Sequence, residues 1–435
     1  MPLALKDATT GVFASYLAQF AGRDPNCPPA LDGLRQRAFA RFSELGFPGR
    51  KDEGWRQTNL NPIAEGVFEP RPAPPPQALV PRLRELDLPG VDWSADALRL
   101  VFINGSFAAG LSATAAPAGC RISTNPALEF LDYAEERDQA FVQLNTAFLR
   151  DAAVIEVAPG AAVERPITIL HLTTGVAAAK GISHPRTLIL AGRESQVRVV
   201  ETSVGFPGEV YFTNAVAAIE AGENAAVEYT RLGQDSGAAF QVSKLRTRQL
   251  RDSRVAAHSL SLGSALTRNN VHAILDGEGA ECTLNGLFAL SGSQHVDNST
   301  ILDHARPLGT SREYYKGVLD GKAVGVFNGR IIVRKDAQHT DAIQSSKNLL
   351  LSDSAATINA QPQLEIYADD VRCTHGATVG QLDAQALFYL RSRGLGLEAS
   401  RKLLIYGFAA DVLGRVQAPG LRERVEALLW RKWAE

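Results

Sequence analysis

Cys373 and His375 are the two side chains of this chain with the clearest capacity for chemistry. They stand two residues apart, between an apolar run and a segment predicted to be helical. In an extended strand, residues at i and i+2 share one face, so the thiol and the imidazole can point toward one ligand. Thiolate and neutral imidazole are ligands for iron in clusters, for zinc and for copper. Two ligands do not complete a metal site, so the others would come from elsewhere in the fold or from a second chain.

The same pair also has a purely structural interpretation, which the spacing alone favours. A free cysteine is among the most frequently buried residue types, and a single histidine near a strand end is often only hydrogen bonded. Short motif matches are frequently fortuitous. The seven other histidines stand singly along predicted strands and are interpreted as structural: His171, His184, His258, His272, His295, His304 and His339.

Length and composition narrow the class of protein. A chain of 435 residues is too long for one ordinary compact core, so we expect several domains or an elongated array. The formal charge of -2 provides no basic surface for nucleic acid. No secretion signal is recognisable in residues 1–20, and no stretch approaches the roughly 20 apolar residues of a membrane span. We therefore expect a cytoplasmic protein that contacts neither nucleic acid nor membrane. Its cysteines lack Cys-x-x-Cys spacing and are expected to be reduced thiols: Cys27, Cys120, Cys282 and Cys373.

The N-terminal part of the chain shows helical periodicity. Apolar residues recur at helical spacing in 13–20 and again in 34–45, which predicts two amphipathic helices. The proline-rich segment 70–76 ends any helix and favours extended geometry, so it is interpreted as a linker. We predict an N-terminal helical domain over 1–80, including this linker.

From 95 to 380 the periodicity changes to that of strands. Val227 and Tyr229 alternate with polar neighbours, and Cys282 and Leu284 do the same. Turn signals recur at nearly constant spacing and then less regularly, at Gly160, Gly192, Gly222, Asp252, Asp276, Asp320 and Asp353. Such a repeat is typical of stacked coils, so the pattern favours a right-handed parallel β-helix. A sandwich or barrel, in which turns follow one another more closely, is the alternative.

The last region, 381–435, is predicted to be helical again. Asp383 is suited to cap a helix that ends near Gly394. Leu404, Phe408 and Val412 mark the apolar face of a second helix, and residues 421–428 mark a third. These helices either cap the last coil or form a docking surface.

Several functional motifs are absent from the sequence. There is no G-x-x-x-x-G-K-[ST] loop, so any use of ATP must come from a partner. There is no complete dinucleotide fingerprint, no H-E-x-x-H and no G-x-S-x-G. The chain is therefore not expected to be an enzyme of these classes.

Four stretches in the C-terminal half nonetheless carry a specific family resemblance. Residues 344–351, 361–366, 369–378 and 388–394 resemble the SufB/SufD family, the scaffold subunits of the Suf iron-sulfur cluster assembly machine. The Glu-x-Trp-x-x-Thr order at 53–58, the Asp-Asp-Val-x-Cys-x-His order and the overall length resemble the SufD branch more than the SufB branch. The paralogous SufB type remains the alternative within the family.

The resemblance implies a fold, partners and roles for particular residues. It implies a right-handed parallel β-helix core between helical domains, paired with SufB through the β-helices and with the ATPase SufC through C-terminal helices. His375 and Cys373 match the positions near the partner's cluster-building cysteine, and the helix bearing Leu404, Phe408 and Val412 matches the ATPase-docking region. The resemblance further implies a transient, shared iron-sulfur cluster and no cofactor held stably by the isolated chain. The family's complex is associated with reduced flavin, for which no motif is found here.

Two interpretations outside this family stay open. Parallel β-helices also form carbohydrate-active enzymes, but these need aligned carboxylates, and the adjacent Asp369 and Asp370 would point to opposite faces of a strand. The chain could also be a homodimeric structural protein in which Cys373 is simply buried.

Overall fold

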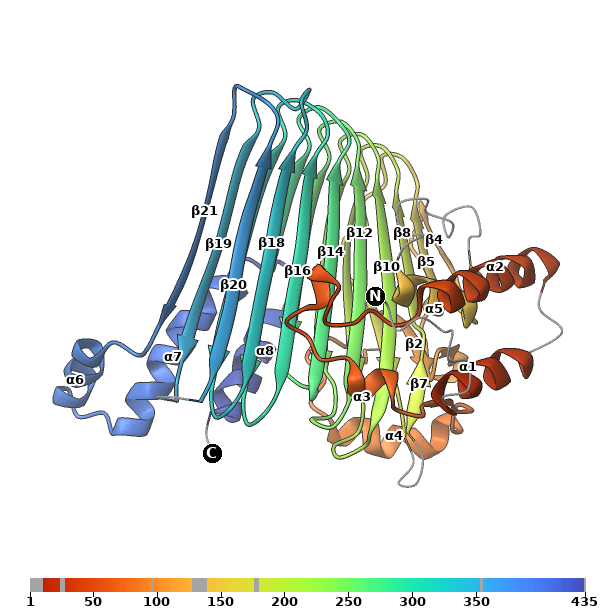
Figure 1. The fold of residues 1–435 in the computed structure, drawn as a ribbon, viewed down its shortest axis with the longest axis horizontal. Helices are drawn as coiled ribbons and strands as arrows, with labels where there is room; N and C mark the ends of the chain where they lie inside the picture. The colour runs from red at the N-terminus through yellow and green to blue at the C-terminus, as the bar shows by residue number, and fades with distance from the viewer. Residues whose placement is uncertain are drawn as a thin grey trace.

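Two long, facing β-sheets form the body of the molecule (Figure 1). The structure is a computed structural model that describes residues 11–23, 28–94, 97–126, 139–175, 180–352 and 355–433. From β8 onward, successive strands enter the two sheets in turn, and neighbours within each sheet are parallel. Each pair of successive strands therefore makes one coil of a solenoid, and the predicted β-helix is confirmed. The parallel pairing excludes the sandwich of antiparallel strands.

We name the sheets A and B. The strands of sheet A are β1 (Glu69–Pro70), β4 (Cys120–Ser123), β5 (Ala153–Val157), β7 (Gly181–Ser183), β8 (Arg186–Ala191), β10 (Tyr211–Ala221), β12 (Phe240–Gln249), β14 (Leu266–Leu275), β16 (His295–His304), β18 (Val324–Val333) and β20 (Thr357–Ile366). The strands of sheet B are β2 (Leu98–Ile103), β3 (Ser106–Phe107), β6 (Ile167–Leu172), β9 (Gln196–Val204), β11 (Ala226–Gln234), β13 (Arg254–Ser261), β15 (Glu281–Leu290), β17 (Thr310–Leu319), β19 (Asp341–Leu350) and β21 (Arg372–Gly380).

The length of one coil follows from the register. Ala226 pairs with Arg254, and Arg254 pairs with Glu281, so each of these intervals is one coil. The spacing predicted from turn signals such as Gly192 and Gly222 was therefore close to one coil. Asp276 lies in a turn from sheet A to sheet B, whereas Asp320 lies in a turn from B to A. The irregular interval between these two aspartates is thus one and a half coils.

One turn of each coil is held by a residue with left-handed backbone geometry. Asn224 (φ 55°) donates its N–H to the carbonyl of Arg251, and Asp252 (φ 54°) donates to the carbonyl of Glu278, at 2.9 Å each. Asparagine and aspartate tolerate this conformation better than most residues. The turns thus extend the backbone hydrogen bonding of the sheets along the solenoid axis.

The interior is built from stacked columns of inward-facing side chains. In a parallel ladder without slippage, residues in register stand above one another on the same face. Val227 and Tyr229 of β11 and Cys282 and Leu284 of β15 all lie in the main core cluster, as the alternating pattern predicted. We use "column" below for such a set of in-register residues.

The N-terminal helices cover part of the outer face of sheet A (Figure 1). The two predicted helices are α1 (Gly11–Ala21) and α2 (Pro29–Leu45), and they are followed by the short helices η2 (Glu53–Trp55) and α3 (Asn61–Ala64). Phe42 of α2 packs in one cluster with Phe212 of β10. α5 (Ala140–Ala147), which was not predicted, packs against α2 within the same layer. The predicted domain limits stay predictions, and Cys27 lies outside the described residues.

The proline-rich segment lies between two elements that pack against the solenoid, β1 and α4. Glu69 and Pro70 form β1 and pair with β7. After residues 71–75, α4 (Pro76–Glu85) starts at a proline, which is favourable at the first helical position. Leu79 and Leu83 of α4 are buried in a cluster with Leu170 of β6. Residues 71–75 have no regular secondary structure, and the assignment of this segment as a linker stays a prediction.

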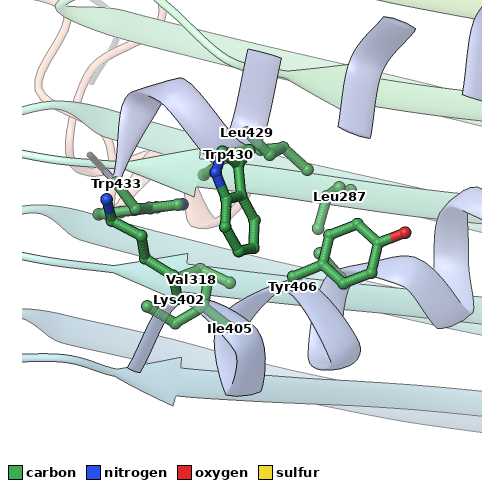
Figure 2. Close-up of a pocket in the computed structure, with 10 residues that line it drawn as sticks. Leu287, Val318, Lys402, Ile405, Tyr406, Leu429, Trp430 and Trp433 are labelled. Atoms are coloured by element: carbon green, nitrogen blue, oxygen red, sulfur yellow. The ribbon is translucent and has the colours of Figure 1, made fainter. Parts of the chain in front are cut away.

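The C-terminal helices are α6 (Ala384–Ser392), α7 (Leu397–Leu413) and α8 (Leu421–Lys432). Asp383 caps α6 through hydrogen bonds from the N–H groups of Gln385 and Ala386, as predicted. Figure 2 shows α7 and α8 lying over sheet B, with Trp430 and Tyr406 beside Leu287. Within the described residues, no helix is long and apolar enough to cross a membrane.

Candidate functional site at the open end of the solenoid

The last coil of the solenoid ends in two unpaired strand edges. Among the described strands, β20 pairs only with β18, and β21 pairs only with β19. Pro362 stands in the middle of β20, which suits an edge because proline lacks the N–H that a ladder needs. Figure 1 shows both strands at the end of the molecule opposite the N-terminal helices. Long free edges of this kind invite pairing with another chain.

Cys373 lies on β21 and faces the interior of this last coil. It pairs in register with Ala342, which pairs with Ser311, and it packs against the main core cluster. Burial raises the pKa of the Cys373 thiol, and the carboxylate of Asp341 raises it further, while a backbone hydrogen bond from Ala342 acts in the opposite direction. The thiol is thus protonated near neutral pH, and a metal ion must displace its proton to bind.

His375 belongs to the next column along the same strand. It pairs with Gln344, which pairs with Glu313 of β17, and these two neighbours are buried. Because Cys373 faces inward, the alternation of the strand places His375 on the same side. No further coil follows β21 in the described chain, so His375 remains exposed although its column is interior. The predicted common face of Cys373 and His375 is confirmed by this register.

Two polar residues behind His375 were not singled out from the sequence. The amide Nε2 of Gln344 donates to Glu313 Oε2 at 2.6 Å. Burial raises the pKa of Glu313 to about 7, against the effect of hydrogen bonding from Thr300 and Gln344. The available signal was the occurrence of polar residues at inward positions of alternating strands. That signal does not reveal that Glu313 and Gln344, which lie on different strands, are neighbours.

The described residues contain no group of three or more His, Cys, Asp or Glu side chains that could hold a metal ion. A thiolate and an imidazole, the side-chain types of Cys373 and His375, are donors that iron-sulfur clusters accept. Completion of such a site by a second chain stays a prediction. Asp369 and Asp370 lie in the turn before β21 and not in a strand, and the Asp370 carboxylate lies 3.0 Å from His339 Nδ1.

A protein-family model matches the part of the chain that contains Cys373 and His375. Residues 173–408, which include β21 and the Cys373–His375 pair, match the family model described as "SUF system FeS cluster assembly, SufBD core domain". The chain belongs to the SufBD family. It is therefore a protein of iron-sulfur cluster assembly, and the match spans the later coils of the solenoid together with α6 and most of α7.

Individual relatives cover nearly the whole chain. The iron-sulfur cluster assembly protein SufD of Escherichia coli is 29% identical over 91% of this chain and 92% of its own length. An iron-sulfur cluster assembly SufBD family protein of Synechocystis is 33% identical over 91% of this chain and 89% of its own. Protein ABCI7 of Arabidopsis thaliana, described as chloroplastic, is 29% identical over 94% of this chain and 88% of its own length.

The Glu-x-Trp-x-x-Thr segment at 53–58, which resembles the SufD branch, contacts sheet A. Thr58 donates a hydrogen bond to the buried carboxylate of Asp297 on β16, which also pairs with the guanidinium of Arg268 on β14. The Arg268 guanidinium lies 4.6 Å from the centre of the Trp55 ring. Together these contacts clamp the N-terminal domain to sheet A, and we call Trp55, Thr58, Arg268 and Asp297 the N-terminal clamp.

The apolar stripe predicted to dock an ATPase faces the chain's own sheet B. Val412 is fully buried in a cluster with Leu260 and Leu287. Phe408 is half-buried, and its carbonyl accepts a hydrogen bond from Lys316 Nζ at 2.8 Å. Leu404 is also half-buried. The exposed apolar side chains of this SufBD protein's C-terminal helices lie elsewhere, at Phe388, Tyr389, Leu397, Leu403 and Trp430.

Proposed function

We propose that this chain is a SufD-type scaffold subunit that contributes Cys373 and His375 to a site of iron-sulfur cluster assembly shared with a SufB-type partner. The observation that carries the proposal is the position of both side chains on the inward face of the last, unpaired coil. A second chain placed against that coil would cover the face that the first chain leaves open. The cluster is then cargo that is built and passed on.

Pairing through the free edges of β20 and β21 supports this arrangement. Each edge offers the backbone donors and acceptors of about one full strand, and a partner with a similar end can continue both sheets. The exposed apolar side chains Ile366, Tyr367 and Val379 lie on or next to these strands. In isolation, two copies of this chain would pair through the same edges.

We further propose that α6 and the exposed side of α7, which carries Leu397 and Leu403, dock an ATPase of the SufC type. The chain carries no phosphate-binding loop of its own. Phe388 is 74% exposed and Tyr389 is 56% exposed, and no residue of α6 is buried. Large aromatic side chains left this accessible are characteristic of interaction sites. ATP binding to the docked subunits would then move α6 and α7 and bias the interface between the scaffolds.

The chemistry of the two residues suits a transient site. Because burial raises the pKa of Cys373, little thiolate forms near neutral pH until a metal ion or a partner stabilises it. His375 offers a ring nitrogen at an accessible position. One thiolate and one imidazole bind too weakly for permanent storage, which favours release of the finished cluster.

Reconstitution with SufB-type and SufC-type partners tests the proposal. We expect His375→Ala and Cys373→Ser to preserve the complex on size-exclusion chromatography and to reduce cluster formation, followed by visible absorbance and bound iron. Thr374→Ala, on the outward face of the same strand, serves as the matched control. Cluster formation at the unmutated rate in the His375→Ala complex would refute the assigned site.

A further inference from the structure

A column of three polar residues leads from the interior of the solenoid to the proposed assembly site. Glu313 of β17, Gln344 of β19 and His375 of β21 follow one another in register. Strands in a sheet lie roughly 4.8 Å apart, so each side chain stands directly behind the next. The first two are almost completely buried, with exposed fractions of 2% and 1%. Only His375, at the open end, reaches solvent.

The amide of Gln344 is held in one orientation. Its Nε2 donates to Glu313 Oε2 at 2.6 Å, so its Oε1 is left as a hydrogen-bond acceptor. Among the residues that the structure describes, Gln344 Oε1 has no hydrogen-bond partner. A buried acceptor without a donor costs roughly 1–3 kcal/mol, so a donor in the next position of the column would be stabilising.

The facing sheet leaves room for this amide. Gly329 of β18 lies opposite, and a Cβ atom at that position would stand only 2.3 Å from Gln344 Nε2. A side chain at 329 would therefore displace the Gln344 amide. The backbone of Gly329 does not have the positive φ angle that favours glycine. What the glycine provides here is the space that the Gln344 amide occupies.

We propose that Gln344 and Glu313 are positioning residues for His375. A rotation of the exposed His375 side chain would let one imidazole N–H donate to the unpartnered Oε1 of Gln344, and Glu313 fixes the amide that presents this oxygen. One ring nitrogen then carries the proton, and the other keeps its lone pair for iron or for a partner. This inference rests on the proposed function of His375 at the shared assembly site.

The tautomer of His375 provides a readout that a merely structural role would not change. We would record nitrogen-detected spectra of the full chain labelled at histidine and assign the His375 signals by their loss in His375→Ala. In the unmutated chain we expect one tautomer to dominate. Gln344→Leu should produce a mixture of both tautomers, and Glu313→Gln should shift the spectrum in the same direction to a smaller extent.

Substitutions at the buried residues Gln344 and Glu313 could weaken the fold, so two further variants are included in the tautomer experiment. Gly329→Ala changes no residue of the column but places a methyl group where the Gln344 amide lies. It should therefore also produce a mixture of both His375 tautomers. Ser346→Ala is the matched control, because it removes the buried acceptor of an Asn348 hydrogen bond on the same strand without touching the column. It should leave the His375 signals unchanged.

Cluster formation in the reconstituted complex gives the second readout. Loss of an outer-shell partner typically lowers metal affinity or activity roughly 10- to 100-fold, so we expect about a tenfold slower rate for Gln344→Leu. Identical His375 tautomers in the unmutated chain and in Gln344→Leu would overturn this inference. If His375→Ala itself builds cluster normally, the proposed function fails, whereas the tautomer result still decides the positioning role.

Discussion

Cys282 and Cys373 occupy the same inward-facing column of sheet B, three coils apart. Cys282 pairs with Ser311, Ser311 with Ala342, and Ala342 with Cys373. Burial raises the pKa of both thiols, but Cys282 is enclosed by coils on both sides, whereas Cys373 lies in the last coil and is only half-buried. Position along the solenoid therefore separates an inert thiol from an accessible one.

This relationship predicts how the two thiols react. We expect iodoacetamide to label Cys373 in the folded chain and Cys282 only after unfolding, because the thiolate must be both formed and accessible. The rate at Cys373 should continue to rise with pH beyond 9, since its pKa lies above the ordinary value of 9.0. Peptide mass spectrometry separates these sites from the half-buried Cys120, and Cys373→Ser identifies the signal. Equal labelling of Cys282 in the native chain would contradict the enclosed position.

The N-terminal clamp predicts a large effect on stability. Asp297→Ala leaves the guanidinium of Arg268 buried without its carboxylate, a change that typically costs about 3–5 kcal/mol. Thr58→Val removes one hydrogen bond to the same carboxylate and should cost about 1–3 kcal/mol. Urea unfolding measures both, and limited proteolysis should release the N-terminal helices first in Asp297→Ala. Unchanged unfolding midpoints in both variants would show that the clamp does not hold the domain.

The C-terminal helices allow folding and docking to be separated by a pair of variants. Val412→Asp places a charge in the contact between α7 and sheet B, so it should lower the thermal unfolding temperature. Leu403→Asp changes a side chain that is 41% exposed and should leave the unfolding temperature almost unchanged. If the proposed docking surface is correct, Leu403→Asp nevertheless retains less SufC-type ATPase in a pull-down. Full retention by this folded variant would place the docking surface elsewhere.

Glu313 predicts a pH dependence of the free energy of unfolding. Because burial raises its pKa from 4.5 to about 7, the folded state binds the proton more tightly than the unfolded state. The resulting stabilisation is complete below about pH 4.5 and is lost as the pH rises through about 7. Relative to Glu313→Gln, the unmutated chain should lose on the order of 3 kcal/mol across this interval. Urea titrations of both proteins between pH 5 and pH 8 measure this loss. The other titrating groups contribute equally to both proteins and cancel in the difference. Curves of unfolding free energy against pH that run parallel for the two proteins would contradict the burial of a titrating carboxyl.

Much of the architecture followed from local patterns. The period-2 alternation around Val227 and Cys282 identified inward faces correctly, because stacked coils bury one face of each strand and the pattern reports burial directly. Asp383 predicted the start of α6 for an equally local reason, the need of the first N–H groups for an acceptor. α5 and the packing of α4 against sheet B did not follow, since short apolar elements take their structure from the surfaces that they meet.

The apolar face of α7 shows a second limit of prediction from sequence. Of the predicted face of α7, only Val412 is buried, whereas Leu404 and Phe408 are half-buried, and the buried side runs through Ile405, Ala409 and Leu413. An amphipathic pattern predicts that one face of a helix is buried, but it does not identify the surface that buries it. In the folded chain sheet B covers much of it, and the exposed apolar residues lie on positions between the periodic ones.

By itself the sequence determined the coiled β architecture, the helical ends and the shared face of Cys373 and His375, because each depends on short local spacings. The tertiary structure decided that this face is the open end of the interior and that Gln344 and Glu313 stand behind His375. Register between coils sets those neighbours. It depends on the length of every intervening turn and on the packing of the whole core, which no local spacing records.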